Sequence, residues 1–351
     1  MVTNPRVSII VPCRNEIDHI EKTIKSILVQ QSPIGGFEVI VADGASDDGT
    51  RNILMKLAKD DTRLRIVNNH GQIVSTGLNA AIRESRGSII IRMDAHTEYA
   101  PDYVRRCVEV LQTTGADNVG GPARTKAMNY AQAAISAAYH SRFSVGGARF
   151  HNVNYEGPVD TVTYGCWHRR VFDRVGFFDE ELVRNQDDEF NLRLKRAGGK
   201  IWQSPLIRSW YSPRASLIRL FKQYMQYGYW KVRVIQKHKI PAAIRHLIPS
   251  SFVLMLTVLP ILSFHWRPAL STWIALIGLY AISNVAASFV TASRWGWKLF
   301  PILPLVFAAY HFGYGYGFLL GILDFILLRH RPGNSYTKLT RNSESLVYPK
   351  K

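Results

Sequence analysis

The sequence predicts an α/β domain with a mainly parallel sheet, followed by a C-terminal α-helical transmembrane region. First, short runs of β-favouring apolar residues alternate with helical segments over about the first 120 residues, which is typical of βαβ units. Second, three long apolar runs follow one another near the C-terminus. Third, residues 191–323 contain no Asp or Glu, although Lys and Arg recur there.

The elements of the α/β domain follow from hydrophobic periodicity. Strands are expected at 7–12, 37–42, 64–67, 88–91 and 160–169, and a further one ends at Gly121. Helices are expected at 16–31, after the turn at 43–50, at 75–85, 101–113 and 127–143, and from Phe190 onward. Residues 144–158 carry Gly and Asn without an apolar period, which predicts a loop beside the site, either a lid or an ordinary surface loop.

Composition limits the classes of function. The chain has 351 residues and a net charge of +18, so nucleic acid or an anionic membrane surface is the expected partner. The basic region is also strongly apolar, which favours the membrane over nucleic acid. Three cysteines without disulfide or zinc spacing indicate a reducing compartment, and no signal peptide is expected at the start. No G-x-G-x-x-G or Walker A sequence follows a strand, which argues against dinucleotide and P-loop sites.

The stretch S-I-I-I-R-M-D-A-H-T-E at 88–98 reads as a central strand that delivers polar groups to the carboxyl edge of the sheet. If the chain stays extended, Asp94, His96 and Glu98 share one face. A carboxylate and an imidazole suit a divalent cation, which could hold a diphosphate. The alternative is that Asp94 only caps the next helix.

Two further loops open at the same edge. The first contains Pro12, Arg14 and Glu16, and the second runs from Asp43 through Ser46 to Thr50. Asp43 can accept a hydrogen bond from a base N–H, and Arg14 can meet a phosphate. The alternative for the second loop is a helix cap.

These residues carry a family resemblance. The motifs V-S-I-I-V-P-C-R-N-E, V-I-V-A-D-G-A-S-D-D-G-T, G-L-N-A-A-I and R-M-D-A-H resemble those of the inverting family 2 glycosyltransferases with the GT-A fold, over about residues 5–235. Within that family the chain is most similar to membrane-associated transferases of bacterial exopolysaccharide assembly, of the succinoglycan glucosyltransferase type. The resemblance implies a nucleotide-sugar donor, usually a UDP-sugar such as a UDP-hexose.

The resemblance also implies roles for the donor residues. Pro12, Arg14 and Glu16 would line the nucleoside pocket, with Ser46 beside them, and Asp43 would hold the base. Asp94 would be the first Asp of the family's D-x-D metal motif.

The second position of D-x-D is His96 in this chain, a departure from the family pattern. Imidazole favours Mn²⁺-like ions, so we expect Asp94 and His96 to ligate a divalent metal, with Mn²⁺ preferred over Mg²⁺. The alternative is that His96 contacts sugar or phosphate while Glu98 or water completes the metal shell.

Inversion at an anomeric carbon requires a general base for the acceptor hydroxyl. In the family an E-D pair before a helix supplies it, and Gln186-Asp187 stands at that place. Asp187 is the expected base, with Asp188 second. The alternative is that these acids only favour the helix dipole. Trp167 aligns with the acceptor-side strand, so it either stacks on a sugar or belongs to the core.

Residues 216–239 mix apolar and basic side chains without an acid, which predicts one or two interfacial amphipathic helices. Within them Gln226, Tyr229 and Trp230 resemble the Q-x-x-R-W box of processive synthases, with Tyr in place of Arg, and are expected on the acceptor side. The alternative is an aromatic belt at the membrane interface.

The apolar runs at 247–264, 269–292 and 299–328 are each long enough, or nearly so, to span a bilayer. Three spans would put the basic tail outside, against the positive-inside rule. The third run has Gly313, Gly315 and Gly317 near its middle, so a re-entrant segment or two short helices would return the tail to the cytosol.

The expected organisation is therefore a glycosyltransferase domain at 1–212, basic interfacial helices at 213–246, transmembrane helices at 247–330 and a basic tail at 331–351. The expected function is sugar transfer to a lipid-linked (polyprenyl diphosphate) acceptor at an anionic inner membrane, with the catalytic domain in the cytosol and other polysaccharide-assembly proteins as possible partners. The alternatives are a processive polysaccharide synthase, a polyprenyl-phosphate glycosyltransferase and a non-catalytic binding module.

Overall fold

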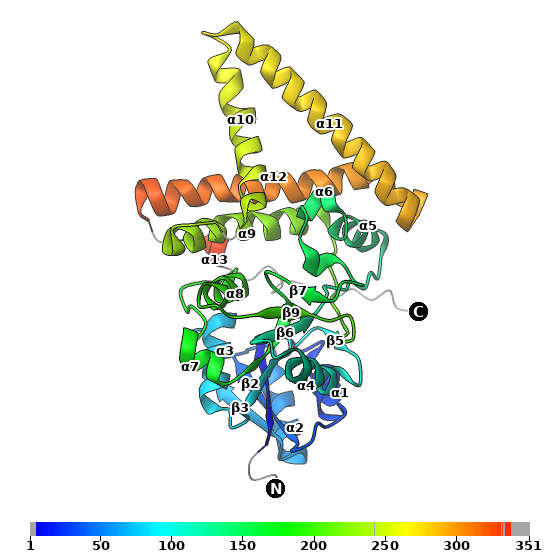
Figure 1. Ribbon diagram of the computed structural model, residues 1–351, viewed down its shortest axis with the longest axis vertical. Helices are drawn as coiled ribbons and strands as arrows, with labels where there is room; N and C mark the ends of the chain where they lie inside the picture. Colours follow the sequence, from blue (N-terminus) through cyan, green and yellow to red (C-terminus); the bar gives the residue numbers. More distant parts are fainter. Residues whose placement is uncertain (1–4, 242, 331, 333, 338–351) are drawn as a thin grey trace. The chain divides into compact units, whose positions relative to one another are not determined.

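The computed structural model describes residues 5–241, 243–330, 332 and 334–337. The chain forms two compact units, Met1–Lys126 with Gly147–Pro213 and Ala127–Gly146 with Arg214–Lys351. The first unit is the α/β part and the second is helical (Figure 1). The division after Pro213 lies close to the expected domain end at 212, but residues 127–146, expected in the α/β domain, pack with the C-terminal helices.

The first unit contains an eight-stranded sheet in the order β3-β2-β1-β4-β8-β6-β9-β7, and a second sheet of β10 and β5. The strands are β1 (Val7–Cys13), β2 (Phe37–Asp43), β3 (Leu64–Asn68), β4 (Ile89–Arg92), β5 (Glu98–Tyr99), β6 (Asn118–Gly121), β7 (Gly157–Pro158), β8 (Thr163–His168), β9 (Ile201–Gln203) and β10 (Ser209–Trp210).

Half of this sheet is parallel, as the βαβ pattern predicts, because β1 pairs in parallel with both β2 and β4, and β2 with β3. Strand β8 then enters antiparallel between β4 and β6. The carboxyl ends of β1, β2 and β4 therefore meet at one edge, which is where ligands bind in open α/β sheets.

Helices cover both faces of the sheet. They are α1 (Ile20–Leu28), α2 (Thr50–Asp60), α3 (Val74–Glu84), α4 (Tyr103–Thr114), α7 (Arg170–Val175) and α8 (Gln186–Arg196), with the 3₁₀ turn η1 (Arg149–His151) in the segment predicted as a loop. Strand β1 is buried on both sides: Val7, Ile9 and Val11 belong to one core and Ile10 to the other. A strand covered on both faces reads as a continuous apolar run, which is why V-S-I-I-V-P is recognisable in the sequence.

The extended course expected from Ser88 to Glu98 is wrong. Strand β4 ends at Arg92, and the chain turns at Ala95 and His96. Glu98 lies in β5 and pairs with Lys126 at 2.7 Å, so it does not share a strand face with Asp94. The shared face depended on the alternation of side chains along a strand, and the turn at Ala95 and His96 ends that alternation.

The second unit is built from helices and short turns. They are α5 (Tyr130–Tyr139), α6 (Arg142–Val145), α9 (Leu217–His238), η2 (Ile244–His246), α10 (Ile248–Leu262), α11 (Arg267–Trp295), η3 (Trp297–Leu299), α12 (Leu303–Ile322), the π-helical turn η4 (Leu323–Leu328) and α13 (Asn334–Thr337). Small and apolar side chains of α5, among them Ala134 and Ile135, share a buried cluster with Leu303, Val306 and Phe307 of α12. This packing accounts for the place of residues 127–146 in the second unit.

Three segments are long and apolar enough to cross a membrane: Ile244–Leu262, Arg267–Trp295 and Leu303–Leu328. The last does not divide into two short helices, because α12 continues directly into η4. Its glycines do not break the helix; they allow the backbone of a neighbouring helix to approach closely. A Cβ at Gly317 would collide with the carbonyl of Met225 in α9, and one at Gly313 would lie 2.8 Å from that of Phe221.

Candidate active site

The first two loops at the sheet edge hold each other in place. The Oγ of Ser46 accepts a hydrogen bond from the Asn15 amide at 2.9 Å, and Thr50 Oγ1 accepts one from the Glu16 amide at 2.9 Å. Asn15 and Ala45 both have positive φ, 53° and 55°, a conformation that non-glycine residues rarely adopt. Crossed hydrogen bonds of this kind keep a strained loop pair in one conformation.

Asp43 is buried at the end of β2 and already has polar partners. Its Oδ1 accepts from Ser46 Oγ at 2.6 Å, and its Oδ2 accepts from Arg51 Nη1 at 2.8 Å. Arg51 also donates to Asn68 at 2.9 Å. The carboxylate is therefore fixed in orientation by Ser46 and Arg51.

Arg14 lies between the loops with spare donor capacity. One of its terminal nitrogens donates to the carbonyl of Gln72 over 3.4 Å. Its Nε is buried, and within the described residues it has no hydrogen-bond partner. A buried guanidinium nitrogen without an acceptor is costly, and an anionic ligand such as phosphate would supply one.

Arg92, at the end of β4, is the electrostatic centre of the site. Its Nε and Nη2 donate to the two carboxylate oxygens of Asp94 at 2.9 and 3.3 Å. Burial lowers the pKa of Arg92, but the negative charges of Asp94 and Asp187 raise it by more, so the guanidinium stays charged. The structure thus brings the expected metal ligand and the expected base around one cation.

Two tyrosines, Tyr99 of β5 and Tyr164 of β8, contact the Arg92–Asp94 ion pair. The backbone amide of Asp94 donates to the Tyr99 hydroxyl at 2.5 Å, and the Tyr164 hydroxyl shares a 2.6 Å hydrogen bond with Thr97. The Arg92 guanidinium lies 5.9 Å from the centre of the Tyr164 ring. Burial and the charge of Asp94 both raise the pKa of Tyr164, so its hydroxyl remains protonated.

His96 is held from the first loop. Its Nδ1 lies 2.9 Å from Oε1 of Glu16, and both side chains are only partly exposed. A carboxylate that accepts from Nδ1–H leaves Nε2 as the nitrogen able to bind a cation.

Asp187 stands in the first turn of α8. Asn185, the residue before the first residue of α8, has a positive φ of 61°, which sets the direction in which the helix begins. Oδ1 of Asp187 accepts from the amide of Asp188 at 2.9 Å. Glu189, the third acid, is paired with Arg193 at 2.9 Å. Asp187 is also one of the two charges that raise the pKa of Arg92.

With this geometry established, the comparisons with known proteins identify the family. The sequence model described as Glycosyl transferase family 2 matches residues 8–176. The succinoglycan biosynthesis protein ExoA of Rhizobium meliloti (strain 1021) is 31% identical over 328 residues, which cover 92% of this chain and 97% of that protein. This chain belongs to glycosyl transferase family 2.

Two further comparisons agree with the family 2 assignment. The dolichyl N-acetyl-α-D-glucosaminyl phosphate 3-β-D-2,3-diacetamido-2,3-dideoxy-β-D-glucuronosyltransferase of Methanococcus voltae is 26% identical over 90% of this chain and 97% of its own length. Among solved structures, the mannosyltransferase PcManGT of Pyrobaculum calidifontis, in complex with GDP-Man and Mn²⁺, superposes with a TM-score of 0.57 at 20% identity, over 91% of this chain and 88% of that one. The predicted GT-A fold and glycosyltransferase class are confirmed.

The residues of this family 2 site fit a divalent cation held by few protein ligands. Within the described part of the chain, no three His, Cys, Asp or Glu side chains gather as a metal cluster. Asp94 and His96 together offer one carboxylate and one imidazole, and Glu16 fixes the ring of His96. A donor diphosphate would have to complete such a shell.

The residues expected on the acceptor side are buried, and they are divided between the two units. Trp167 is buried against Phe172, Phe178 and Phe190, with ring centres 5.8–6.0 Å apart, which supports the core alternative for this tryptophan. Gln226, Tyr229 and Trp230 belong to the second unit and are buried there. Their proposed contact with an acceptor stays a prediction.

The Tyr that replaces Arg in the Q-x-x-R-W-like box has its own partners. The hydroxyl of Tyr229 donates to Asp324 at 2.8 Å, and its ring stacks on Tyr336 at 3.9 Å. The indole N–H of Trp230 donates to the carbonyl of Tyr336 at 3.0 Å. These contacts tie α9 to the segment that follows α12.

Sequence reasoning missed several residues of the site. No role in the site was predicted for Arg92, Tyr99 and Tyr164, although each meets Asp94 or its ion pair. Arg92 carried a signal, because a charged residue inside an apolar strand is rarely buried without a partner. Tyr164 gave none, since its positive φ of 65° appears only in the structure.

Proposed function

We propose that this glycosyltransferase moves a sugar, with inversion, from a nucleotide sugar to a lipid-linked saccharide during cell-surface polysaccharide assembly. The observation that carries the proposal is the arrangement around Arg92, which gathers a donor-side carboxylate, Asp94, and a candidate base, Asp187. A donor site and a base near one another are what a single displacement requires.

The relatives support a lipid-linked acceptor. One is named for succinoglycan biosynthesis and the other for transfer to a dolichyl-linked sugar phosphate, and both match nearly the whole chain, including its helical unit. A polyprenyl diphosphate carrying a saccharide is the acceptor we propose. The cytoplasmic membrane, with the catalytic unit in the cytosol, is the proposed location.

The donor would lie across the loops at the sheet edge. Asp43, positioned by Ser46 and Arg51, would accept from the base, Pro12 would line the nucleoside pocket, and Arg14 would donate to phosphate through its unpaired Nε. We propose a UDP-hexose as the donor.

Asp94 and His96 would hold a divalent metal, and the Mn²⁺ of the mannosyltransferase with the same fold supports such an ion. The metal, when bound, would neutralise charge that develops on the leaving diphosphate. Because one ligand is an imidazole, we propose that Mn²⁺ is preferred over Mg²⁺.

Asp187 would accept the proton of the acceptor hydroxyl as its oxygen attacks the anomeric carbon. The bond from that carbon to the nucleoside diphosphate breaks in the same step, so the configuration inverts. Arg92 would hold Asp94 in place through its two hydrogen bonds and would place a positive charge near Asp187.

The test is a panel of UDP- and GDP-sugars incubated with membranes that contain the protein, scored for release of nucleoside diphosphate and for lipid-linked product. One donor should give one added sugar per acceptor, in the inverted configuration. Chains of many added sugars would instead identify a processive synthase. Nucleotide binding without turnover on any tested donor would identify a binding module.

A further inference from the structure

We propose that this chain crosses the bilayer only twice, through the α10–α11 hairpin, and that α12 with η4 lies along the membrane interface on the side of the catalytic unit. By length and composition alone, three segments qualify as spans. Their arrangement within the second unit separates the third segment from the other two.

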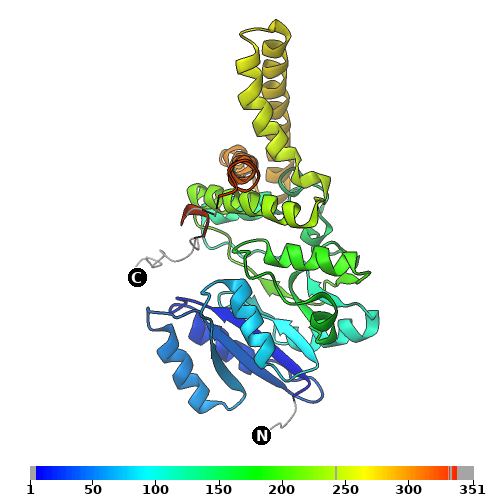
Figure 2. The same ribbon diagram turned by 90° about the vertical axis from the view of Figure 1, so that its left-hand side faces the viewer.

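The three segments do not share a direction. Figure 1 shows α10 and α11 meeting at the top of the view and diverging toward α12, which lies crosswise to α10; Figure 2 shows α12 end-on, in orange, beside the upright pair. Helices that span one bilayer are tilted by about 20° from its normal on average. The hairpin and α12 therefore cannot all be spans at once.

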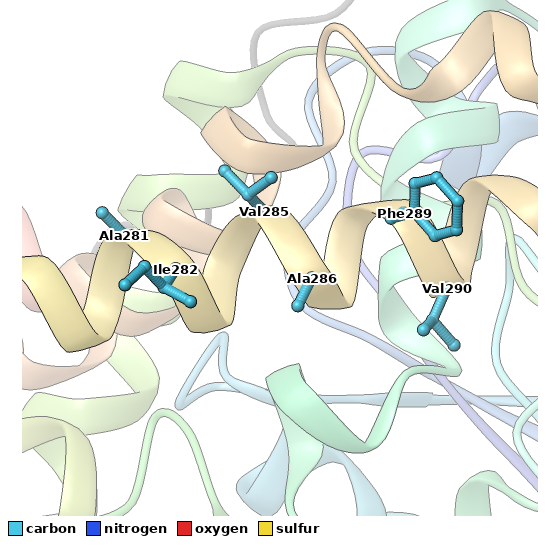
Figure 3. A pocket seen from close by; sticks show the side chains of 6 residues that line it. All are labelled: Ala281, Ile282, Val285, Ala286, Phe289 and Val290. Atoms are coloured by element: carbon cyan, nitrogen blue, oxygen red, sulfur yellow. The ribbon is translucent and has the colours of Figure 1, made fainter.

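The exposed apolar surface identifies the hairpin as the spanning part. Only 11% and 17% of the apolar windows of its two segments are buried, compared with 39% for Leu303–Leu328. One face of α11 between Ala281 and Val290 carries only apolar side chains around an open groove (Figure 3). Exposed apolar surface of this kind marks a membrane or protein contact, and the length and apolar composition of α11 suit a membrane.

The partner of α12 argues against a transmembrane position. Helix α9 packs along it in the same direction, since Phe221, Met225 and Tyr229 meet Gly313, Gly317 and Gly321 in turn. If α12 spanned the bilayer, these contacts would draw α9 into the hydrocarbon. Helix α9 carries five Lys or Arg residues in its 22 positions, and charges inside a bilayer are costly.

Backbone carbonyls of residues 127–146 also accept hydrogen bonds from the first half of α12. The Tyr310 hydroxyl donates to the carbonyl of Ile135 at 3.2 Å, and Nε2 of His311 lies 2.8 Å from the carbonyl of Phe143. Ile135 and Phe143 belong to 127–146, which the chain reaches from the catalytic unit and leaves back to it. An interfacial α12 lets this segment stay at the surface.

Two spans also remove the conflict between three spans and the positive-inside rule. With two, the tail that begins at Arg329 returns to the side of the catalytic unit. The tail's Tyr336 lies against Tyr229 and Trp230 of α9, which agrees with that return.

The topology can be tested by adding one cysteine at a time to the full chain. Each variant is treated with a membrane-impermeant maleimide in sealed vesicles of both orientations. The three native cysteines are buried, so the wild-type chain gives the blank. Lys59→Cys marks the catalytic unit, Phe264→Cys marks the turn of the hairpin, and Lys351→Cys marks the tail. We expect Lys351→Cys to react on the same side as Lys59→Cys, and Phe264→Cys on the other. Labelling of Lys351→Cys together with Phe264→Cys would overturn the proposal.

A matched pair of charges tests the interfacial position itself. Tyr316 stands near the middle of the third apolar segment and Ile282 near the middle of α11, and they are 48% and 70% exposed. Ile282→Lys should reduce the membrane-inserted amount several-fold, whereas Tyr316→Lys should retain at least about half of it, because interfacial charges reach water. An equal loss in both variants would show that α12 is immersed as deeply as α11, and the proposal would fail.

Discussion

Asp187 and Asp94 carry like charges in one small site, and the positive charge of Arg92 offsets their repulsion. Without the guanidinium, the two negative charges would only repel each other. Arg92 is nearly buried and bonds directly to Asp94, so it serves the donor side by contact and Asp187 by charge alone. The two acids can therefore be separated by mutation.

Asp187→Asn removes the proposed proton acceptor and keeps the shape of the side chain. We expect turnover to fall by about 10²-fold or more, because general-base catalysis contributes 10²- to 10⁴-fold. Nucleotide-sugar affinity, measured by calorimetry, should stay within about twofold, since the proposed role of Asp187 is toward the acceptor and not the donor. Asp188→Asn is the control, and a larger loss there would move the base to Asp188.

His96→Asp tests the imidazole as a metal ligand by restoring an all-oxygen pair with Asp94. Imidazole favours Mn²⁺ over Mg²⁺, so the ratio of initial rates with the two ions should shrink in the variant. Rates are measured against metal concentration for both proteins. A ratio that does not move would show that His96 is not a ligand.

Glu16→Gln tests whether Glu16 orients His96 instead of lining the nucleoside pocket. Loss of a carboxylate behind a ligating imidazole weakens metal binding by about 10- to 100-fold. Mn²⁺ binding in the presence of a nucleoside diphosphate, followed by electron paramagnetic resonance, should weaken accordingly, while metal-free nucleotide binding should not. Glu98→Gln, at a carboxylate paired with Lys126, should leave Mn²⁺ binding unchanged. Weaker metal-free nucleotide binding in Glu16→Gln would return the residue to the nucleoside pocket.

At the scale of elements, the parallel half of the sheet was the most predictable part. Strands β1 and β2 are buried on both faces, so their apolar runs stand out from the flanking loops, and the ends differ from expectation by only a residue. Helix α1 was placed four residues too early, because residues 16–19 form a turn fixed by hydrogen bonds from the second loop. Hydrogen bonds between loops that are distant in the sequence leave no periodic pattern of apolar residues from which they could be predicted.

The course of residues 127–146 was not predictable from local pattern. Their small and apolar side chains do predict a helix, but the partner of that helix lies about 170 residues further along the chain, as in the contact of Tyr310 with Ile135. The glycines of α12 were likewise noticed as possible breaks, whereas they serve the close approach of α9. Glycine spacing of four along a helix is a packing signal as well as a flexibility signal.

Gly317→Leu tests this packing. The new side chain would start against the carbonyl of Met225, so α9 and α12 must separate, and overpacking typically costs about 1–3 kcal/mol. The midpoint of thermal unfolding in detergent should fall. Gly278→Leu is the matched control in α11, where an added Cβ would meet nothing within 4 Å. Equal midpoints for the two variants would mean that close backbone approach does not stabilise the helical unit.

At the scale of the whole molecule, charge and apolar surface act together. The net charge of +18 is concentrated where acids are absent, so an anionic leaflet should attract the chain beyond what its apolar helices provide. The sequence predicted this attraction for α9 as a helix lying on lipid. In the structure, apolar side chains of α9 pack against α12, and basic residues such as Lys222 and Lys237 are exposed; the contact of α9 with lipid stays a prediction.

Anionic lipid should therefore stabilise the chain through these exposed lysines. The unfolding midpoint in nanodiscs should be higher with anionic than with zwitterionic lipid, and the difference should shrink as salt rises, because the Debye length falls from about 10 Å at 0.1 M to about 3 Å at 1 M. Replacing Lys222 and Lys237 by Gln should remove part of the difference, since each lysine near the surface contributes about 1 kcal/mol. The control replaces Lys56 and Lys59, which are exposed on α2 of the catalytic unit, and should leave the difference intact. If both double variants lose the same amount, the attraction comes from net charge alone and not from the surface that α9 presents.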